Sequence, residues 1–151
     1  MSALLIDSEG FRKLKELSAW VFTFIQMEVE MHNLFRCVDE TRREKVQPFL
    51  SHVGLNNQNF GYKICRVTGN LALEKSSHFR TLMFPLSIGP GSRSIGSGEV
   101  MTNLGLLKPG YWIEIRTVLL INALMDCLIV LLPEQTESQS VQIEPTIGGS
   151  D

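Results

Sequence analysis

The clearest pattern in the chain is an alternation of apolar and polar positions between Trp20 and Phe35. The odd positions from Val21 to Met31 are apolar or nearly so, whereas the even positions change from aromatic to charged. Successive side chains of a strand point to opposite faces, so a period of two predicts one long β-strand over residues 20–35. One face of this strand should be buried, and the other should become solvent-exposed halfway along.

Two further segments have the three-to-four-residue spacing of amphipathic helices. Residues 8–17 predict a short helix with Ser8 as its N-cap. Residues 39–53 predict a second helix, in which Thr41–Glu44 matches a capping box. Pro48 either kinks this helix or marks its true start.

The second half of the chain contains strand patterns separated by turns rich in Gly and Pro. The predicted strands are residues 60–73 with an interruption at Gly69–Asn70, then 78–88, 99–107, 111–121 and 127–132. Pro85 predicts an edge position or a bulge. The apolar run 118–132 is shorter than the roughly 20 residues of a membrane-spanning helix. We interpret it as a pair of buried strands joined by residues 122–126.

These elements predict an α+β, β-rich fold, with a twisted antiparallel sheet or sandwich and one or two packed helices. The length of 151 residues and a hydrophobic content of 44% suit a single domain with its own core. We expect an amphipathic segment at 1–17, a globular domain at 18–132 and a mobile acidic tail at 133–151. The three cysteines are odd in number and follow no signal-peptide pattern, which favours a reducing intracellular compartment.

No catalytic or metal-binding set can be assembled from the sequence. Glu28, Glu30 and His32 share one face of the predicted strand, but no second cluster of ligands accompanies them, so we interpret them as a solvated face. The segment Gly91–Ser97 resembles a phosphate loop, yet it lacks the lysine and the following helix that such loops need. We therefore expect no enzymatic activity, no cofactor and no small-molecule substrate.

The charge is distributed unevenly along the chain, although the net charge is only −2. Residues 1–80 hold 11 basic and 9 acidic residues, and residues 81–151 hold 3 and 7. An anionic partner should therefore contact the first half. The candidate residues are Arg42, Arg43 and Lys45 on the second helix, with Lys63 and Arg66 on the following strand. Aromatic residues suited to base stacking do not alternate with them, which disfavours sequence-specific reading of nucleic acid.

The order of four segments resembles the globular domain of rhabdovirus matrix proteins. The matching segments are Trp20–Ile25, the helix end Ser51–Val53, Phe60–Ile64 continuing to Gly69–Leu71, and Gly110–Ile115. The resemblance covers about residues 18–121. Many members of that family carry a Pro-Pro-x-Tyr budding motif, which this sequence lacks.

The resemblance implies a non-enzymatic structural protein of the virion, the host cytoplasm and the inner membrane face. Its implied partners are further copies of itself, a viral nucleoprotein–RNA complex and an anionic membrane surface. Self-association needs an apolar element, for which the candidates are Leu4 and Leu5 or Leu71 and Leu73. Two alternatives stay open: a plant-virus movement or silencing-suppressor protein that binds nucleic acid non-specifically, and a β-sandwich that binds a protein partner.

Overall fold

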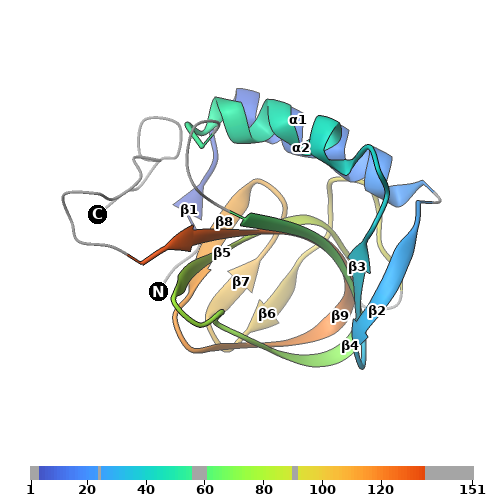
Figure 1. Cartoon of the computed structure of the whole chain (residues 1–151). Coiled ribbons are helices and arrows are strands. Elements are labelled where there is room, and N and C mark those ends of the chain that lie inside the picture. Colours follow the sequence, from blue (N-terminus) through green and yellow to red (C-terminus); the bar gives the residue numbers. More distant parts are fainter. Residues whose placement is uncertain (1–3, 24, 56–60, 90–91, 135–151) are drawn as a thin grey trace.

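A computed structural model describes residues 4–23, 25–55, 61–89 and 92–134. In these residues the chain forms two helices, α1 (Ser8–Phe22) and α2 (Arg42–His52), and nine strands (Figure 1). The strands are β1 (Leu4–Leu5), β2 (Met27–Met31), β3 (Leu34–Cys37), β4 (Gly61–Glu74), β5 (Phe79–Gly89), β6 (Val100–Thr102), β7 (Gly105–Leu107), β8 (Tyr111–Ile115) and β9 (Val118–Pro133). Residues 135–151, most of the predicted tail, lie outside the described residues.

Seven strands form one antiparallel sheet in the order β1-β8-β5-β9-β4-β3-β2. The longest strand pair of this sheet is β4–β9, which is in register from Gly61 opposite Leu131 to Glu74 opposite Val118. The strands β6 and β7 form a separate hairpin. The predicted α+β, β-rich fold class is confirmed.

The sheet separates two hydrophobic cores. On one face, α1 and α2 lie side by side across the strands (Figure 1) and bury Leu14, Leu17 and Phe49 against the sheet. On the other face, Leu107 of the β6–β7 hairpin is buried together with residues such as Ile121 of β9. The molecule thus has three layers: a helix pair, a curved sheet and a small hairpin. Neither helix among the described residues has the length and apolar character that a membrane crossing requires.

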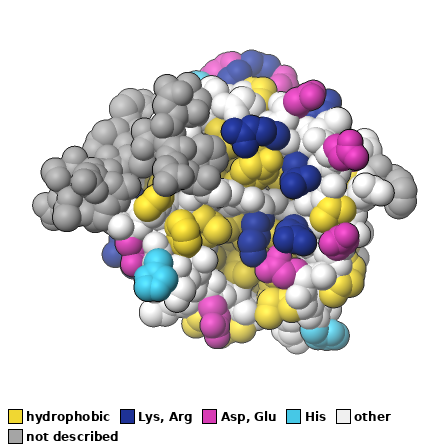
Figure 2. All heavy atoms as spheres, in the orientation of Figure 1, with side chains coloured by type: hydrophobic (Ala, Val, Ile, Leu, Met, Phe, Trp, Pro, Cys, Tyr) yellow, Lys and Arg dark blue, Asp and Glu magenta, His cyan; other side chains and the backbone are white. Residues whose placement is uncertain are grey.

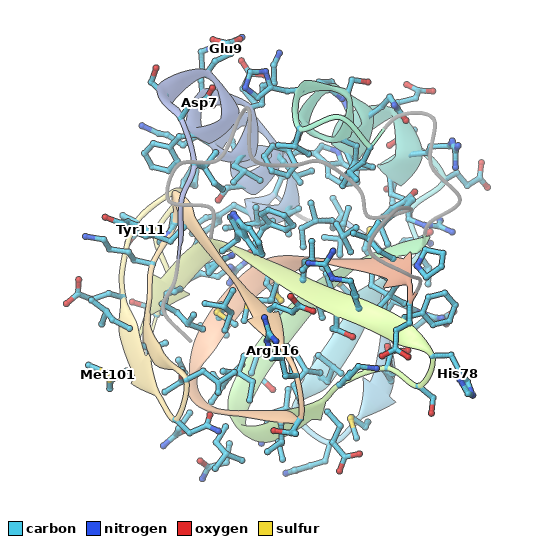
Figure 3. All side chains as sticks on the ribbon, turned by 90° about the vertical axis from the view of Figure 1, so that its left-hand side faces the viewer. Asp7, Glu9, His78, Met101, Tyr111 and Arg116 are labelled. Atoms are coloured by element: carbon cyan, nitrogen blue, oxygen red, sulfur yellow. The ribbon has the colours of Figure 1, made fainter. Side chains whose placement is uncertain are left out.

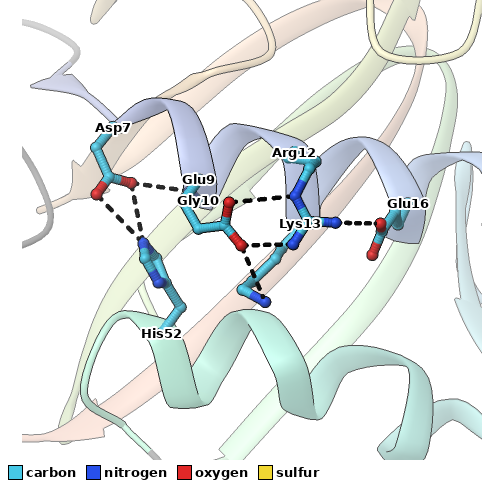
Figure 4. A network of polar contacts seen from close by, with 7 residues as sticks. All are labelled: Asp7, Glu9, Gly10, Arg12, Lys13, Glu16 and His52. Atoms are coloured by element: carbon cyan, nitrogen blue, oxygen red, sulfur yellow. Dashed lines mark hydrogen bonds and ion pairs between the residues drawn. The ribbon is translucent and has the colours of Figure 1, made fainter.

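The two helices are joined to each other at one end by polar contacts (Figure 4). Asp7 caps α1 by accepting a hydrogen bond from the Gly10 N–H at 2.8 Å, and it also contacts His52 Nε2 of α2 at 3.0 Å. Partial burial acts to raise the pKa of Asp7, but these hydrogen bonds outweigh it and lower the pKa below 3.8. Along α1, hydrogen bonds from Arg12 lower the pKa of Glu9 to about 2.

The prediction of one strand over residues 20–35 is wrong. Residues 20–22 belong to α1, because the helical spacing of Leu14 and Leu17 continues to Val21, which is fully buried. Residues 27–31 and 34–37 form the hairpin β2–β3, whose two-residue turn places Asn33 at φ 66°. Asparagine is one of the residues that adopts this left-handed conformation readily. The alternation therefore describes only β2, an edge strand whose Val29 is 68% exposed.

Several other element predictions need smaller corrections. The N-cap of α1 is Asp7 rather than Ser8, and the capping box at Thr41 does not form, since Thr41 makes no side-chain cap hydrogen bond. Pro48 lies within α2 and does not mark its start. Of the two positions predicted for Pro85, the bulge is the one that occurs, since Pro85 lies at a register shift in β5, which is an interior strand.

The predicted strand 111–121 contains two strands, β8 and the start of β9, and β9 continues through the predicted connector 122–126 to Pro133. The strand β4 continues without interruption through Gly69–Asn70. In β9 the polar residues did not break the strand: Asn122 is exposed, and Asp126 is buried but paired with two arginines. Alternation of side chains across the sheet is what places Asn122 outward between buried neighbours.

Candidate functional site

Most cationic side chains of the chain have an anionic partner. All fourteen Lys and Arg residues lie in the described segments, and nine of them place a nitrogen within 4.0 Å of a carboxylate oxygen. The other five have no carboxylate partner among the described residues. They are Lys15, Arg42, Arg43, Lys45 and Lys108. Three of these five belong to the first turn of α2.

We call Arg42, Arg43 and Lys45 the α2 basic cluster. Arg43 and Lys45 are exposed, and Arg42 is half-buried and donates a hydrogen bond to the Asp39 carbonyl oxygen at 2.8 Å. The cluster lies at the N-terminal end of α2, where the helix dipole is already positive. Figure 2 shows Lys and Arg side chains across the upper and middle part of this face of the molecule, with Asp and Glu side chains among them. This end of the helix is therefore suited to an anionic surface.

Three acidic residues accompany the cluster: Asp39 and Glu40 precede α2, and Glu44 lies in its first turn. Asp39 accepts hydrogen bonds from the Thr41 hydroxyl at 2.7 Å and from the Thr41 N–H at 2.8 Å. These two bonds, helped by the charges of Arg42 and Lys45, lower the pKa of Asp39 below 3.8. Asp39 is thus ionised at neutral pH. Together with Glu40 and Glu44 it balances the formal charge of residues 39–45, so the cluster acts through the local placement of its cations and not through a net charge of this segment.

The two strand residues predicted to assist this cluster do not join it. Lys63 and Arg66 are three residues apart on β4, so they point to opposite faces of the sheet. Lys63 Nζ lies 2.8 Å from Glu30 Oε2 of the edge strand. Arg66 Nε lies 2.8 Å from Asp126 Oδ1 on the face that the helices cover. The predicted five-residue patch is therefore reduced to the α2 basic cluster.

Arg66 belongs instead to a polar group around the fully buried Asp126, which we call the Asp126 cluster. Asp126 accepts from Arg66 Nε at 2.8 Å and from Arg93 Nε at 2.6 Å, and the Ser87 hydroxyl lies 3.4 Å away. Arg66 also donates to the Val21 carbonyl oxygen at the C-terminal end of α1. The guanidinium of Arg93 lies 4.5 Å from the ring centroid of Phe22.

The Asp126 cluster joins three parts of the fold: the sheet, the end of α1 and the segment that follows β5. No basic residue lies in the last turn of α1, so Arg66 provides the cation that the negative end of the helix dipole favours. Because two guanidinium groups bind one buried carboxylate, the cluster holds these three parts of the fold together, which we call a structural tie. Sequence reasoning did not find this cluster, although a lone Asp in an apolar run was a signal that it needs buried partners.

The residues predicted for self-association lie in different environments. Leu4 and Leu5 form β1, which pairs with β8 at one edge of the sheet. Leu73 is in the core and only 9% exposed, so it is not available to a partner in the folded domain. Leu71 is partly buried and lines a shallow groove of about 540 Å³.

The groove leads to an exposed apolar surface that the sequence analysis did not identify. Met101 is 69% exposed and Leu120 is 51% exposed, and both line the groove together with Ala72. Met101 is paired across the hairpin with Leu106, which is also exposed. In Figure 3, Met101 lies on the outer side of the β6–β7 hairpin and points away from the sheet. We call these four residues the outer apolar stripe.

A second hollow, of about 610 Å³, lies between the start of α1 and the turn before β8. Phe11, Lys108 and Tyr111 are among the residues that line it. Lys108 Nζ lies 5.0 Å from the ring centroid of Tyr111, and Lys15 Nζ lies 5.5 Å from that of Phe11. The two lysines that lack a carboxylate partner outside α2 are thus placed over aromatic rings, where the ring quadrupole attracts them.

The groups that could carry catalysis or metal binding are dispersed or buried. Among the described residues, no set of three or more His, Cys, Asp or Glu side chains could hold a metal ion. Glu28 and Glu30 form ion pairs with Arg36 and Lys63. The thiols are free and buried, and burial raises the pKa of Cys65 to about 12. A thiol in this state is a poor nucleophile.

Comparison of the chain with protein-family models, with curated proteins and with solved structures gave no match.

Proposed function

We propose that this chain is a non-enzymatic matrix-type protein that assembles with itself, condenses a viral ribonucleoprotein and contacts an anionic membrane face. The observation that carries the proposal is the α2 basic cluster. It concentrates three of the five cationic side chains that have no carboxylate partner among the described residues. Three of the four segments that resemble rhabdovirus matrix proteins also support the proposal. The segment Trp20–Ile25 does not, because it begins in α1, where the family pattern has a strand.

The charge of one copy supports only weak binding to an anionic surface. A Lys or Arg near an anionic membrane contributes on the order of 1 kcal/mol, so the cluster supplies about 3 kcal/mol at most. This corresponds to a dissociation constant in the millimolar range or above. Assembly of several copies would present several clusters to one surface and raise the avidity without any new contact. Self-association and anion binding are thus linked parts of one proposal.

The test is flotation of the full chain with vesicles of neutral lipid containing about a third phosphatidylserine. The variant Arg43→Glu with Lys45→Glu should bind at least tenfold more weakly than the wild type, a change of about 1.4 kcal/mol. The control Lys15→Glu with Lys108→Glu makes the same change in net charge and also starts from lysines without a carboxylate partner. It should bind within twofold of the wild type.

The outcome separates the proposal from its competitor. Equal losses in both double variants would mean that only net charge matters, and the α2 site would be wrong. Binding to single-stranded RNA that falls steeply with salt, with no binding to vesicles, would instead favour a non-specific nucleic-acid-binding protein. Circular dichroism should be unchanged in both variants, because Arg43, Lys45 and Lys15 are exposed and Lys108 is not in the core.

A further inference from the structure

The outer apolar stripe crosses four strands of two different sheets. Leu106 on β7 is opposite Met101 on β6, and Leu120 on β9 is opposite Ala72 on β4. The groove lined by Met101, Leu120 and Ala72 makes the two pairs one continuous surface. All four residues are exposed, whereas their neighbours Leu107, Leu119 and Ile121 point into the core.

The stripe is held rigidly. Asn103, in the β6–β7 turn, donates from its side-chain amide to the Val118 carbonyl oxygen at 3.0 Å and accepts from the Leu120 N–H at 2.7 Å. The strand β5 ends opposite Leu124, so the edge of β9 before Leu124 has no strand partner on that side. The Asn103 amide forms hydrogen bonds with this free edge instead. A surface fixed in this way pays little conformational entropy when a partner binds.

We propose that the outer apolar stripe is the contact between two copies of this chain, an inference that rests on and extends the self-association in the proposed function. The argument is charge complementarity. In a two-fold contact each patch meets itself, so a charged residue there would be placed near its own copy. The residues that line the groove are apolar or are uncharged amides and hydroxyls, such as Asn70, Asn122 and Thr102.

The open edge of the sheet does not meet this condition. Strand β2 exposes Val29 and Met31, but its other face presents Glu28 and Glu30. Antiparallel pairing of two β2 strands centred on Val29 would place Glu28 opposite Glu30 of the other copy, which destabilises a strand pair. The stripe is therefore the apolar surface that suits a second copy, and the β2 edge provides a control surface of similar exposure.

The size of the stripe sets the expected strength. The stripe consists of two strand pairs, each with strands about 4.8 Å apart and each carrying two exposed side chains, so it measures roughly 20 Å by 20 Å, on the order of 400 Å² on each copy. A standard stable interface buries about 800 Å² on each partner. The dimer should accordingly be weak and dependent on concentration in the micromolar range. A dimer of this strength would form only where the local concentration of the chain is high.

The test is sedimentation velocity of the full chain from about 1 to 200 µM. The wild type and Val29→Glu should both show growing dimer, and Met101→Glu should weaken dimerisation at least tenfold. Leu120→Gln, a milder change on a neighbouring strand, should weaken it in the same direction. Both variants replace exposed side chains, and circular dichroism and thermal unfolding should confirm that they fold.

Each other outcome overturns the inference. Dimerisation of Met101→Glu at the wild-type concentration would exclude the stripe, and loss of dimer in Val29→Glu alone would place the contact at the β2 edge. A wild type that stays monomeric throughout would leave the stripe to a different protein. Vesicle binding distinguishes this failure from that of the proposed function. If only the stripe is wrong, the wild type still binds vesicles and Met101→Glu binds them equally well, whereas failure of the proposed function abolishes vesicle binding by the wild type itself.

Discussion

The Asp126 cluster makes a strong prediction about stability, which the substitution Asp126→Asn tests. Asn has nearly the same shape as Asp, but it removes the negative charge that two guanidinium groups share. Arg66 and Arg93 would then be left beside a buried neutral amide, with side-chain exposures of only 20% and 13%. The amide NH₂ would also direct a donor toward groups that can only donate.

The magnitude follows from the burial of the three side chains. Removing one partner of a buried ion pair costs roughly 3–5 kcal/mol, because it leaves an uncompensated charge. The residual exposure of both arginines lets water solvate part of that charge, so we expect about 3 kcal/mol. For a chain of this size, that loss lowers the midpoint of thermal unfolding by roughly 6–12 °C.

The assay is urea unfolding at pH 7, followed by tryptophan fluorescence and by circular dichroism. The control is Arg36→Gln, which breaks the exposed Arg36–Glu28 pair of the β2–β3 hairpin and should change the free energy of unfolding by no more than about 0.5 kcal/mol. If Asp126→Asn is as mild as this control, the cluster does not stabilise the fold, and the description of it as a structural tie is wrong.

Two further predictions concern the helix cap and the thiols. Asp7→Ala removes both the α1 cap and the His52 contact, so it should cost about 1 kcal/mol at pH 7, whereas Ser8→Ala should cost far less. Because the pKa of Asp7 is lowered in the folded state, this stabilisation is present above pH 3.8 and is lost as the pH falls through the folded-state pKa. Urea unfolding should therefore show that the difference in unfolding free energy between Asp7→Ala and the wild type is smaller at pH 3 than at pH 7. An equal difference at both pH values would argue against the charge of Asp7 as its cause. Burial raises the pKa of Cys37, Cys65 and Cys127, so none of these thiols should react with a thiol reagent at pH 8 in the folded protein. All three should react once the protein is unfolded. Rapid labelling of the native protein would show that a described core element opens readily.

The sequence was sufficient for the fold class and for the elements with one unambiguous period. The helix α2 and the strand β5 follow from their apolar residues, and β4 does so except for the predicted interruption at Gly69–Asn70, which does not exist. The end of α1 did not, because Trp20–Phe22 satisfies a period of two and a helical face at once. What decides between them is the start of the helix at Asp7, since a helix that already buries Leu14 and Leu17 gains by burying Val21.

The candidate site could likewise be predicted only where its residues are close together in the sequence. The α2 basic cluster was predictable because its residues are adjacent in one helix, so their proximity does not depend on the tertiary fold. Lys63 and Arg66 were assigned to it wrongly, although an odd spacing on a strand already places them on opposite faces. The Asp126 cluster and the outer apolar stripe unite segments that are distant in sequence. Only the sheet register brings those segments together.

The most direct test of the account is sedimentation of the purified full chain over a range of protein and salt concentrations, with and without anionic vesicles. The account predicts that the protein grows in mass as its concentration rises, that it sediments with the vesicles, and that rising salt releases it from them while the apolar self-association persists. A chain that stays monomeric to about 200 µM and does not bind vesicles even at low salt would contradict both parts of the proposal.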